Sequence, residues 1–298
     1  MRRPKLRSKS YSHYLSALAV FDSLVLISQE MHMLNESLPQ PGLFYGFSHD
    51  ACKIYVFVDS VCNLMSSWLI AVMAMERLCV VCMPFLRNMW CRQRGAVIII
   101  FTLVTVLACT QMFRFVMVEN HQDQCVGSPD QDYIYIPLHI YVYQFALLFI
   151  TPVVVVIVCN TGVLIRIFSV EKATHNENSS STRLTGNVGR HSKTTRMLIA
   201  ISFTYLATTL PLIMLTITVH LLHQHAGNQF AHTFLKILPW MHFLQAVTNL
   251  NYASNFFIYI LSGEKFRVEL RRMFSSDSGS SYGAGSTRTR EEIIMNSY

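Results

Sequence analysis

Long apolar segments alternate with short polar, basic segments along almost the whole chain. Stretches without any Asp, Glu, Lys or Arg run from 95 to 113, 133 to 165, 197 to 235 and 237 to 263. A helix of about 20 apolar residues crosses a membrane. A soluble bundle would need a polar face on each helix, and these stretches lack one. The pattern therefore predicts six membrane spans, over 13–34, 51–83, 95–118, 136–168, 197–222 and 234–261.

Composition and the placement of charge agree with a membrane protein. Hydrophobic residues make up 52% of the chain and charged residues only 14%, against about 25% charged in soluble domains. All but three of the 24 Lys and Arg residues fall on one side of the predicted membrane, which marks that side as cytoplasmic. The exceptions are Lys53, Arg114 and Lys236. The net charge of +7 then reflects contact with anionic inner-leaflet lipid, not nucleic-acid binding.

The second span carries charges at two depths. Asp59 lies seven residues beyond Cys52, near the outer end, and Glu76 and Arg77 lie at the inner end. The 18 positions between Asp59 and Arg77 correspond to about 27 Å of helix, close to the thickness of the hydrocarbon core. Charges inside a membrane are costly unless they have a task.

This spacing of Cys, Asp and Glu-Arg resembles the third helix of rhodopsin-like G-protein-coupled receptors, whose Asp-Arg-Tyr motif would correspond to Glu76-Arg77-Leu78. Leu18-Ala19-Val20-Phe21-Asp22 resembles the family's second helix. Asn255-Phe256-Phe257-Ile258-Tyr259 resembles its Asn-Pro-x-x-Tyr motif, with Phe in place of Pro. The resemblance implies an all-α membrane protein with the seven-transmembrane bundle. The first helix has no counterpart, so we expect six spans and a truncated or incompletely predicted chain.

The resemblance also divides the chain. Residues 1–12 correspond to a cytoplasmic remnant of the first loop, and 13–263 to the receptor bundle. Residues 264–274 are expected to form a short amphipathic helix along the inner leaflet. The serine-rich residues 275–298 are expected to form a disordered cytoplasmic tail, which receptor kinases would phosphorylate and arrestin would bind. Localisation in the plasma membrane is implied.

Only Cys52 and Cys125 fall on the predicted outer side. By topology and by resemblance to the family they are expected to form a disulfide that holds the polar loop over the helix ends. Asn35-Glu36-Ser37 is a glycosylation sequon on the same side. The remaining cysteines are interpreted as packing residues or reduced thiols, and no pair has the spacing of a metal site.

The family's functional residues transfer to positions of this chain. Asp22, Ser66, Asn251, Asn255 and Tyr259 correspond to a sodium-binding and conformational hub, where one carboxylate and neutral oxygens would hold a small cation. Glu76 and Arg77 correspond to the G-protein-coupling end. Positions facing an outer ligand pocket would be Asp59, Asn63, Tyr141, Gln144, Thr209, Leu212, Thr216, Gln245 and Asn249.

We expect Asp59 to bind a cationic group of the ligand, because no Lys or Arg is expected at its depth in the other spans. The alternative is a hydrated carboxylate bonded to neighbours such as Gln245 or Asn249. The end of the last span resembles invertebrate neuropeptide receptors of the FMRFamide and myosuppressin type. The function expected is therefore a receptor for an extracellular peptide or small cationic ligand that activates a heterotrimeric G protein.

Other functions are weighed against this one. A biogenic-amine receptor would also use Asp59, and a truncated receptor fragment would not signal. An opsin would need a lysine where Asn249 stands. A transporter would more often show repeats or broken helices. No nucleophile or metal set suggests an enzyme, and no cofactor is expected apart from sodium.

Overall fold

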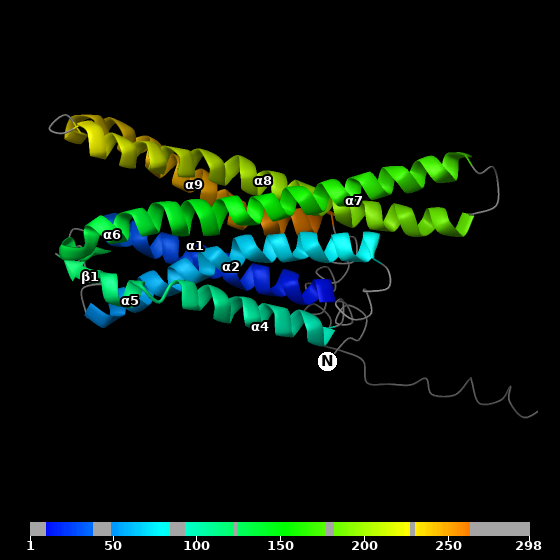
Figure 1. Cartoon of the computed structure of the whole chain (residues 1–298), viewed down its shortest axis with the longest axis horizontal. Helices are drawn as coiled ribbons and strands as arrows, with labels where there is room; N and C mark the ends of the chain where they lie inside the picture. The colour runs from blue at the N-terminus through cyan, green and yellow to red at the C-terminus, as the bar shows by residue number, and fades with distance from the viewer. Residues whose placement is uncertain are drawn as a thin grey trace, which may run out of the picture.

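The computed structural model of the chain is a bundle of long helices (Figure 1). The structure describes residues 10–37, 49–83, 93–121, 124–176, 182–226 and 230–262. The long helices within these ranges are α1 (Ser10–Ser37), α2 (His49–Cys82), α4 (Gln93–Thr110), α7 (Thr151–Asn176), α8 (Thr182–Ala226) and α9 (Phe230–Ser262). The fold is thus almost wholly helical, as the sequence predicts.

Within the described residues, five helical segments are long and apolar enough to cross a membrane. They are Ser12–Leu34, Asp50–Cys82, Gln93–Met117, Pro129–Ser169 and Ala200–His225. The sixth predicted span, 234–261, is helical within α9 but is not among these five. The predicted cytoplasmic tail and the amphipathic helix at 264–274 lie outside the described residues.

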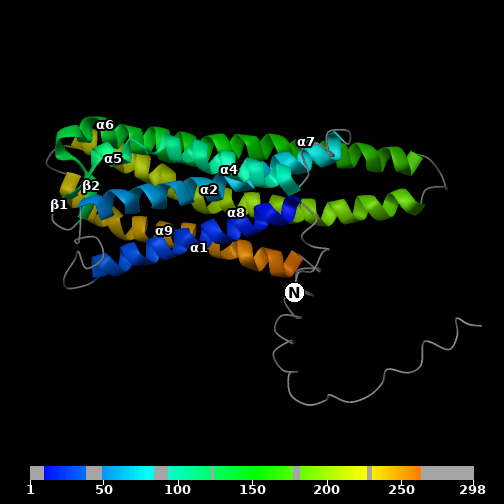
Figure 2. The same ribbon diagram turned by 90° about the horizontal axis from the view of Figure 1, so that it is seen from below.

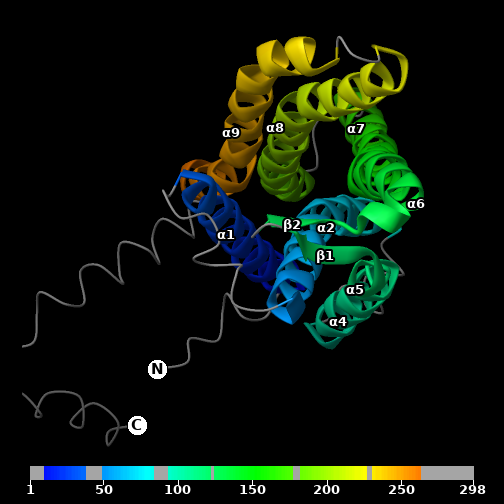
Figure 3. The ribbon, with the colours of Figure 1, turned by 90° about the vertical axis from the view of Figure 1, so that its left-hand side faces the viewer.

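Helix α2 forms the centre of the bundle. It packs against α1, α4, α7, α8 and the segment that precedes α7, and the view along the helices shows α4 on its outer side (Figure 3). Leu64, Met65, Leu69 and Met73 of α2 are completely buried. By contrast, Phe101 of α4 is 73% exposed, as a lipid-facing side chain would be. The functional residues of α2 are therefore held by the most deeply buried of the candidate membrane spans.

The connection between α4 and α7 is more structured than the sequence predicts. The expected span 95–118 is interrupted after α4 by a turn and the short helix α5 (Arg114–Met117). The expected loop is an antiparallel hairpin of β1 (Val118–His121) and β2 (Gln124–Gly127). Next come η1 (Pro129–Gln131), α6 (Asp132–Pro137) and the π-helix η2 (Leu138–Ile150), which runs directly into α7. The strands are only four residues long, and their sequences, VENH and QCVG, do not alternate between polar and apolar residues. Sequence reasoning therefore missed the hairpin.

Pro152 explains how η2 is tied to its neighbours. Proline has no backbone N–H. Another residue at this position would donate to the Leu147 carbonyl in a π-helix or to the Leu148 carbonyl in an α-helix. Trp68 of α2 donates its indole N–H to the Leu147 carbonyl at 3.0 Å, and the Tyr205 hydroxyl of α8 donates to the Leu148 carbonyl. Both carbonyls are thus satisfied by side chains, and three segments meet at one proline.

The two ends of the bundle differ. The hairpin closes one end, whereas α7 and α8 extend beyond the other helices at the opposite end (Figure 1). Seen from below, α1 lies beside α9 (Figure 2), and the two helices are in contact. The end with Cys52 and the hairpin is called the outer end below, in accordance with the predicted topology.

Candidate functional site

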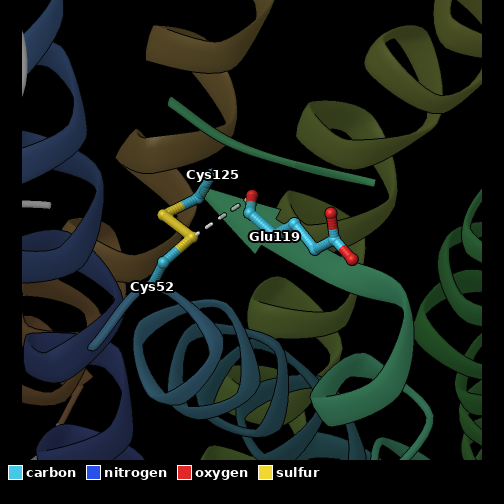
Figure 4. The surroundings of a disulfide bond; sticks show 3 residues. All are labelled: Cys52, Glu119 and Cys125. Carbon is cyan, nitrogen blue, oxygen red and sulfur yellow. Dashed lines mark hydrogen bonds between the residues drawn. A yellow bond between two sulfur atoms is a disulfide. The ribbon is translucent and has the colours of Figure 1, made fainter. Parts of the chain in front are cut away.

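A disulfide fixes the hairpin to the outer end of α2. Cys52 and Cys125 are bonded across 73 residues, with a Cα–Cα distance of 5.6 Å. The Sγ atom of Cys52 also lies 3.7 Å from the carbonyl oxygen of Glu119 on β1 (Figure 4). The predicted disulfide is confirmed. It places β1 and β2 over the helices that carry the predicted ligand-binding residues.

Asp59 of α2 is half-buried, and its carboxylate is hydrogen-bonded to a side chain of α1. Its Oδ1 accepts a hydrogen bond from the Ser28 hydroxyl at 2.6 Å, and Tyr55 donates to the Ser28 carbonyl at 2.9 Å. The suggested partners Gln245 and Asn249 are not the ones the structure shows. Gln245 donates instead to Asn249 at 3.2 Å and to Gln29 at 3.4 Å.

Arg114 corrects a second expectation about Asp59. The sequence placed this arginine on the outer side, and no basic residue was expected at the depth of Asp59. The structure buries Arg114 completely and brings its charge close enough to act on the Asp59 carboxylate. The error arose because the Arg114 side chain bonds to Tyr135 of α6 and His139 of η2 inside the bundle and does not reach the outer surface.

Neutral and aromatic groups surround the Arg114 guanidinium. It donates to Gln111 Oε1 at 3.0 Å, to the Tyr135 hydroxyl at 3.2 Å and to His139 Nδ1 at 3.1 Å. Its central carbon lies 4.5 Å from the centroid of the Tyr143 ring, a distance at which a cation is attracted to a π face. Arg114 thereby connects α5 to α6 and η2 beneath the hairpin.

The other predicted pocket residues lie on three elements around α2. Gln144 of η2 lies near His139, and Tyr141 packs edge-on against His220 of α8 with centroids 5.6 Å apart. On α8, Thr216 donates to the Leu212 carbonyl at 3.0 Å. The buried Thr209 hydroxyl has no hydrogen-bond partner within the described part of the chain.

Hydrogen bonds also connect α9 to α2 and α8 in this region. The Tyr252 hydroxyl donates to Asn63 Oδ1 on α2 at 2.9 Å, while Asn63 Nδ2 donates to the Asp59 carbonyl at 2.9 Å. Thr248 donates to the Thr208 carbonyl at 3.0 Å, three residues before Pro211 of α8. Direct hydrogen bonds thus join α9 to both α2 and α8.

The predicted hub is assembled around Asp22. Ser66 donates to Oδ1 at 2.5 Å and Asn255 donates to Oδ2 at 2.8 Å, so α1, α2 and α9 meet at one buried carboxylate. Asn251 is completely buried one turn before Asn255, and its amide has no hydrogen-bond partner among the described residues. Asn255 Oδ1 is likewise without one in that part of the chain. Carboxylate and orphaned amide oxygens are ligands that suit a small hard cation. Tyr259 lies in α9, but its side chain is outside the described part.

Glu76 and Arg77 lie half-buried in the last two turns of α2, on the same unbroken helix as Asp59. The predicted separation of the two charges along one helix is thus retained. Asn35 belongs to the last turn of α1, and its side chain is outside the described part of the chain.

Sequence reasoning missed several residues that build this site. Ser28, Trp68, His139, Tyr205 and Tyr252 each bind a partner more than 20 positions away. Only Trp68 and Tyr205 could have been sought from the sequence, because a proline such as Pro152 within a span leaves backbone carbonyls that need other donors. The other pairings depend on which helices become neighbours.

Comparison with known proteins gives one finding. The family model described as "7 transmembrane receptor (rhodopsin family)" matches residues 1–249, which is most of the chain. A comparison with curated proteins finds no match.

Proposed function

The chain belongs to the rhodopsin family of seven-transmembrane receptors, and from the residues around Asp59 we infer that its ligand carries a cationic group. Membership makes it a multi-pass membrane receptor of the G-protein-coupled class and not an enzyme. The kind of ligand, the coupling residues and the plasma-membrane location are the finer points proposed here.

The observation that carries the proposal is a carboxylate that is only half-buried beneath the hairpin. Ser28 donates to one oxygen of Asp59. The Asn63 side chain and the charge of His32 also act on this carboxylate. Arg114 balances part of the charge from a distance and directs its own hydrogen bonds to neutral acceptors. A ligand ammonium or guanidinium would therefore meet a carboxylate that is partly exposed and stabilised in its charged form by neighbouring donors and positive charge.

We propose a peptide ligand, because the hairpin and the spread of pocket positions over α2, η2, α8 and α9 suit a ligand larger than an amine. Asp59 would bind the peptide's cationic group. The same helix would transmit the effect to Glu76 and Arg77, where a heterotrimeric G protein binds. An agonist that binds the open state more tightly shifts the equilibrium towards it.

The hub at Asp22 would take part in the same switch. A sodium ion held by Asp22, Ser66 and the amide oxygens of Asn251 and Asn255 would favour one arrangement of α1, α2 and α9. The ion supplies positive charge to a buried carboxylate. Release of that charge would alter the contact between Asp22 and Asn255.

The test uses the full chain in cells with a G-protein activation readout. Amidated peptides that contain arginine are compared with the same peptides carrying citrulline, which is neutral. We expect activation by an arginine peptide and at least a tenfold loss of potency with Asp59→Asn, because a desolvated charge loses its partner.

Ser28→Ala is the matched control, since it removes only a neutral donor from the same carboxylate. It should change potency less than Asp59→Asn. Surface expression is measured for both, because Asp59→Asn also removes the negative charge near Arg114. Equal potency of the arginine and citrulline peptides would contradict the proposal. Activation by small amines alone would favour an amine receptor.

A further inference from the structure

A chain of contacts runs from Arg114 through His139 to Gln144, one of the predicted ligand-binding residues. Arg114 Nη2 lies 3.1 Å from His139 Nδ1, and the amide nitrogen of Gln144 lies 3.4 Å from His139 Nε2. Both ring nitrogens of one histidine are therefore approached by nitrogen-bearing groups.

The first contact fixes the tautomer of His139. An arginine side chain stays protonated in proteins and only donates hydrogen bonds. Nδ1 must therefore accept, and the hydrogen of the neutral ring is on Nε2. An imidazolium would have hydrogens on both nitrogens and would place a second positive charge beside the guanidinium. The neutral form with Nε2–H is the one that the geometry allows.

The contact between His139 Nε2 and Gln144 then requires a hydrogen-bond acceptor on Gln144. With hydrogen on Nε2, an amide nitrogen at that place would set two donors against each other. A half-turn of the Gln144 amide exchanges its oxygen and nitrogen with almost no change in shape. Oε1 then accepts from His139, and the NH2 group faces away from it.

We propose that Arg114, acting through His139, holds Gln144 with its NH2 group towards the pocket, so that this side binds a hydrogen-bond acceptor of the ligand. The acceptor class is a carboxylate or carbonyl oxygen. The inference rests on the proposed function and deepens it, because Asp59 would bind a cation in the same pocket. The favoured ligand thus carries a cationic group and an acceptor at separate points.

Arg114 and His139 are positioning residues here, and Gln144 is the residue that selects the ligand. Tyr143 supports the arrangement, since its ring packs on the guanidinium at 4.5 Å and stacks on His139 with centroids 5.2 Å apart. Tyr135 stacks on the other side of His139, at 5.8 Å. These two stacked rings restrict rotation of the imidazole.

The first experiment reads the tautomer directly. The purified full chain is labelled with 15N-histidine, and the His139 signals are assigned by their loss in His139→Phe. We expect the pattern of a neutral ring protonated on Nε2 at neutral pH. A ring protonated on Nδ1, or an imidazolium, would overturn the proposal whether or not the receptor signals.

The second experiment measures binding with two small probes, 4-guanidinobutyrate and pentylguanidine. They share a guanidinium and chain length, but only the first has an acceptor. Dissociation constants come from the concentration dependence of thermal stabilisation. We expect the wild type to prefer 4-guanidinobutyrate by about tenfold, as a charge-assisted hydrogen bond allows.

Substitutions test whether Gln144 is the residue that causes this preference. Gln144→Leu should abolish it, and Gln144→Glu should reverse it, because the new carboxylate repels the probe's. Gln224→Glu is the control. It makes the same chemical change at an exposed glutamine of α8 that also contacts a histidine, His220, at 3.1 Å, and it should leave the preference intact.

Equal affinity of the two probes for the wild type would overturn the inference, as would failure of both to bind at their solubility limit. The G-protein assay above is separate from these measurements. If the probe preference and tautomer are observed but no peptide activates a G protein, the signalling proposal fails while the specificity of the pocket stands.

Discussion

The junction at Pro152 gives the sharpest quantitative prediction. Tyr205→Phe removes the hydroxyl that donates to the Leu148 carbonyl and leaves the ring in place. Tyr205 is only 4% exposed, so water cannot readily take over as donor. We expect the variant to be less stable because a buried carbonyl loses its hydrogen-bond partner.

The expected loss of stability follows from leaving the Leu148 carbonyl without a hydrogen-bond donor. Leaving a buried acceptor unsatisfied costs about 1–3 kcal/mol, and hydrogen bonds between membrane helices are worth about 1 kcal/mol. We therefore expect a loss of about 1–2 kcal/mol. For a chain of this size that corresponds to a decrease in Tm of roughly 2–8 °C.

A double-mutant cycle attributes that loss to the proline. Pro152→Ala restores a backbone N–H that can bond the freed carbonyls, so Tyr205→Phe should cost about 1 kcal/mol less in that background. Tyr252→Phe is the matched control. It removes a buried hydroxyl whose partner is the Asn63 side chain, and its cost should be the same with or without Pro152→Ala.

The assay is the Tm of each single and double variant, purified in one detergent and measured with a thiol-reactive dye or tryptophan fluorescence. Binding of a fixed ligand is omitted, because it would stabilise each variant by a different amount. If Tyr205→Phe lowers Tm equally with and without the Pro152→Ala substitution, the hydroxyl does not serve the carbonyl that the proline leaves open, and the reasoning is refuted.

Other perturbations test the remaining parts of the site. Arg77→Ala should abolish G-protein activation with ligand binding retained, and equal loss of both would indicate a folding role instead. Cys125→Ser should reduce surface expression, as measured by antibody labelling, because the hairpin is no longer held to α2. Replacement of potassium by sodium at equal ionic strength should raise Tm for the wild type but not for Asp22→Asn. A tag inserted at Asn178 should be stained only after cells are permeabilised, and staining of intact cells would reverse the predicted topology.

The sequence predicted those features that depend on composition along one helix. Apolar runs predicted the spans, and the spacing of Cys52, Asp59 and Arg77 predicted that one helix carries charges at both ends. Asp22, Ser66 and Asn255 are in contact, as the resemblance implies. In each case the signal is either periodic or carried by a residue type that is rare inside membranes.

The sequence could not predict features that depend on how segments pack. The side chain of Arg114 is buried against α6 and η2, and no periodicity indicates where a buried arginine will find acceptors. The hairpin is held by a disulfide and by backbone pairing, which any side chains of suitable size permit. Ser28 was overlooked because a serine in a helix usually bonds its own backbone, whereas here it also reaches Asp59.

The length of α8 has a mechanical consequence. Its 45 residues form a rod about 68 Å long, more than twice the thickness of the hydrocarbon core. Pro211 weakens the rod well away from its inner end, about 44 Å from Thr182. A rotation of only about 10° at that point would move the inner end by roughly 8 Å, as a lever does. Close to this pivot, Thr248 of α9 donates to the Thr208 carbonyl of α8, and Tyr205 of α8 donates to the Leu148 carbonyl of η2. Small displacements at these two contacts would therefore become large ones at the far end of α8.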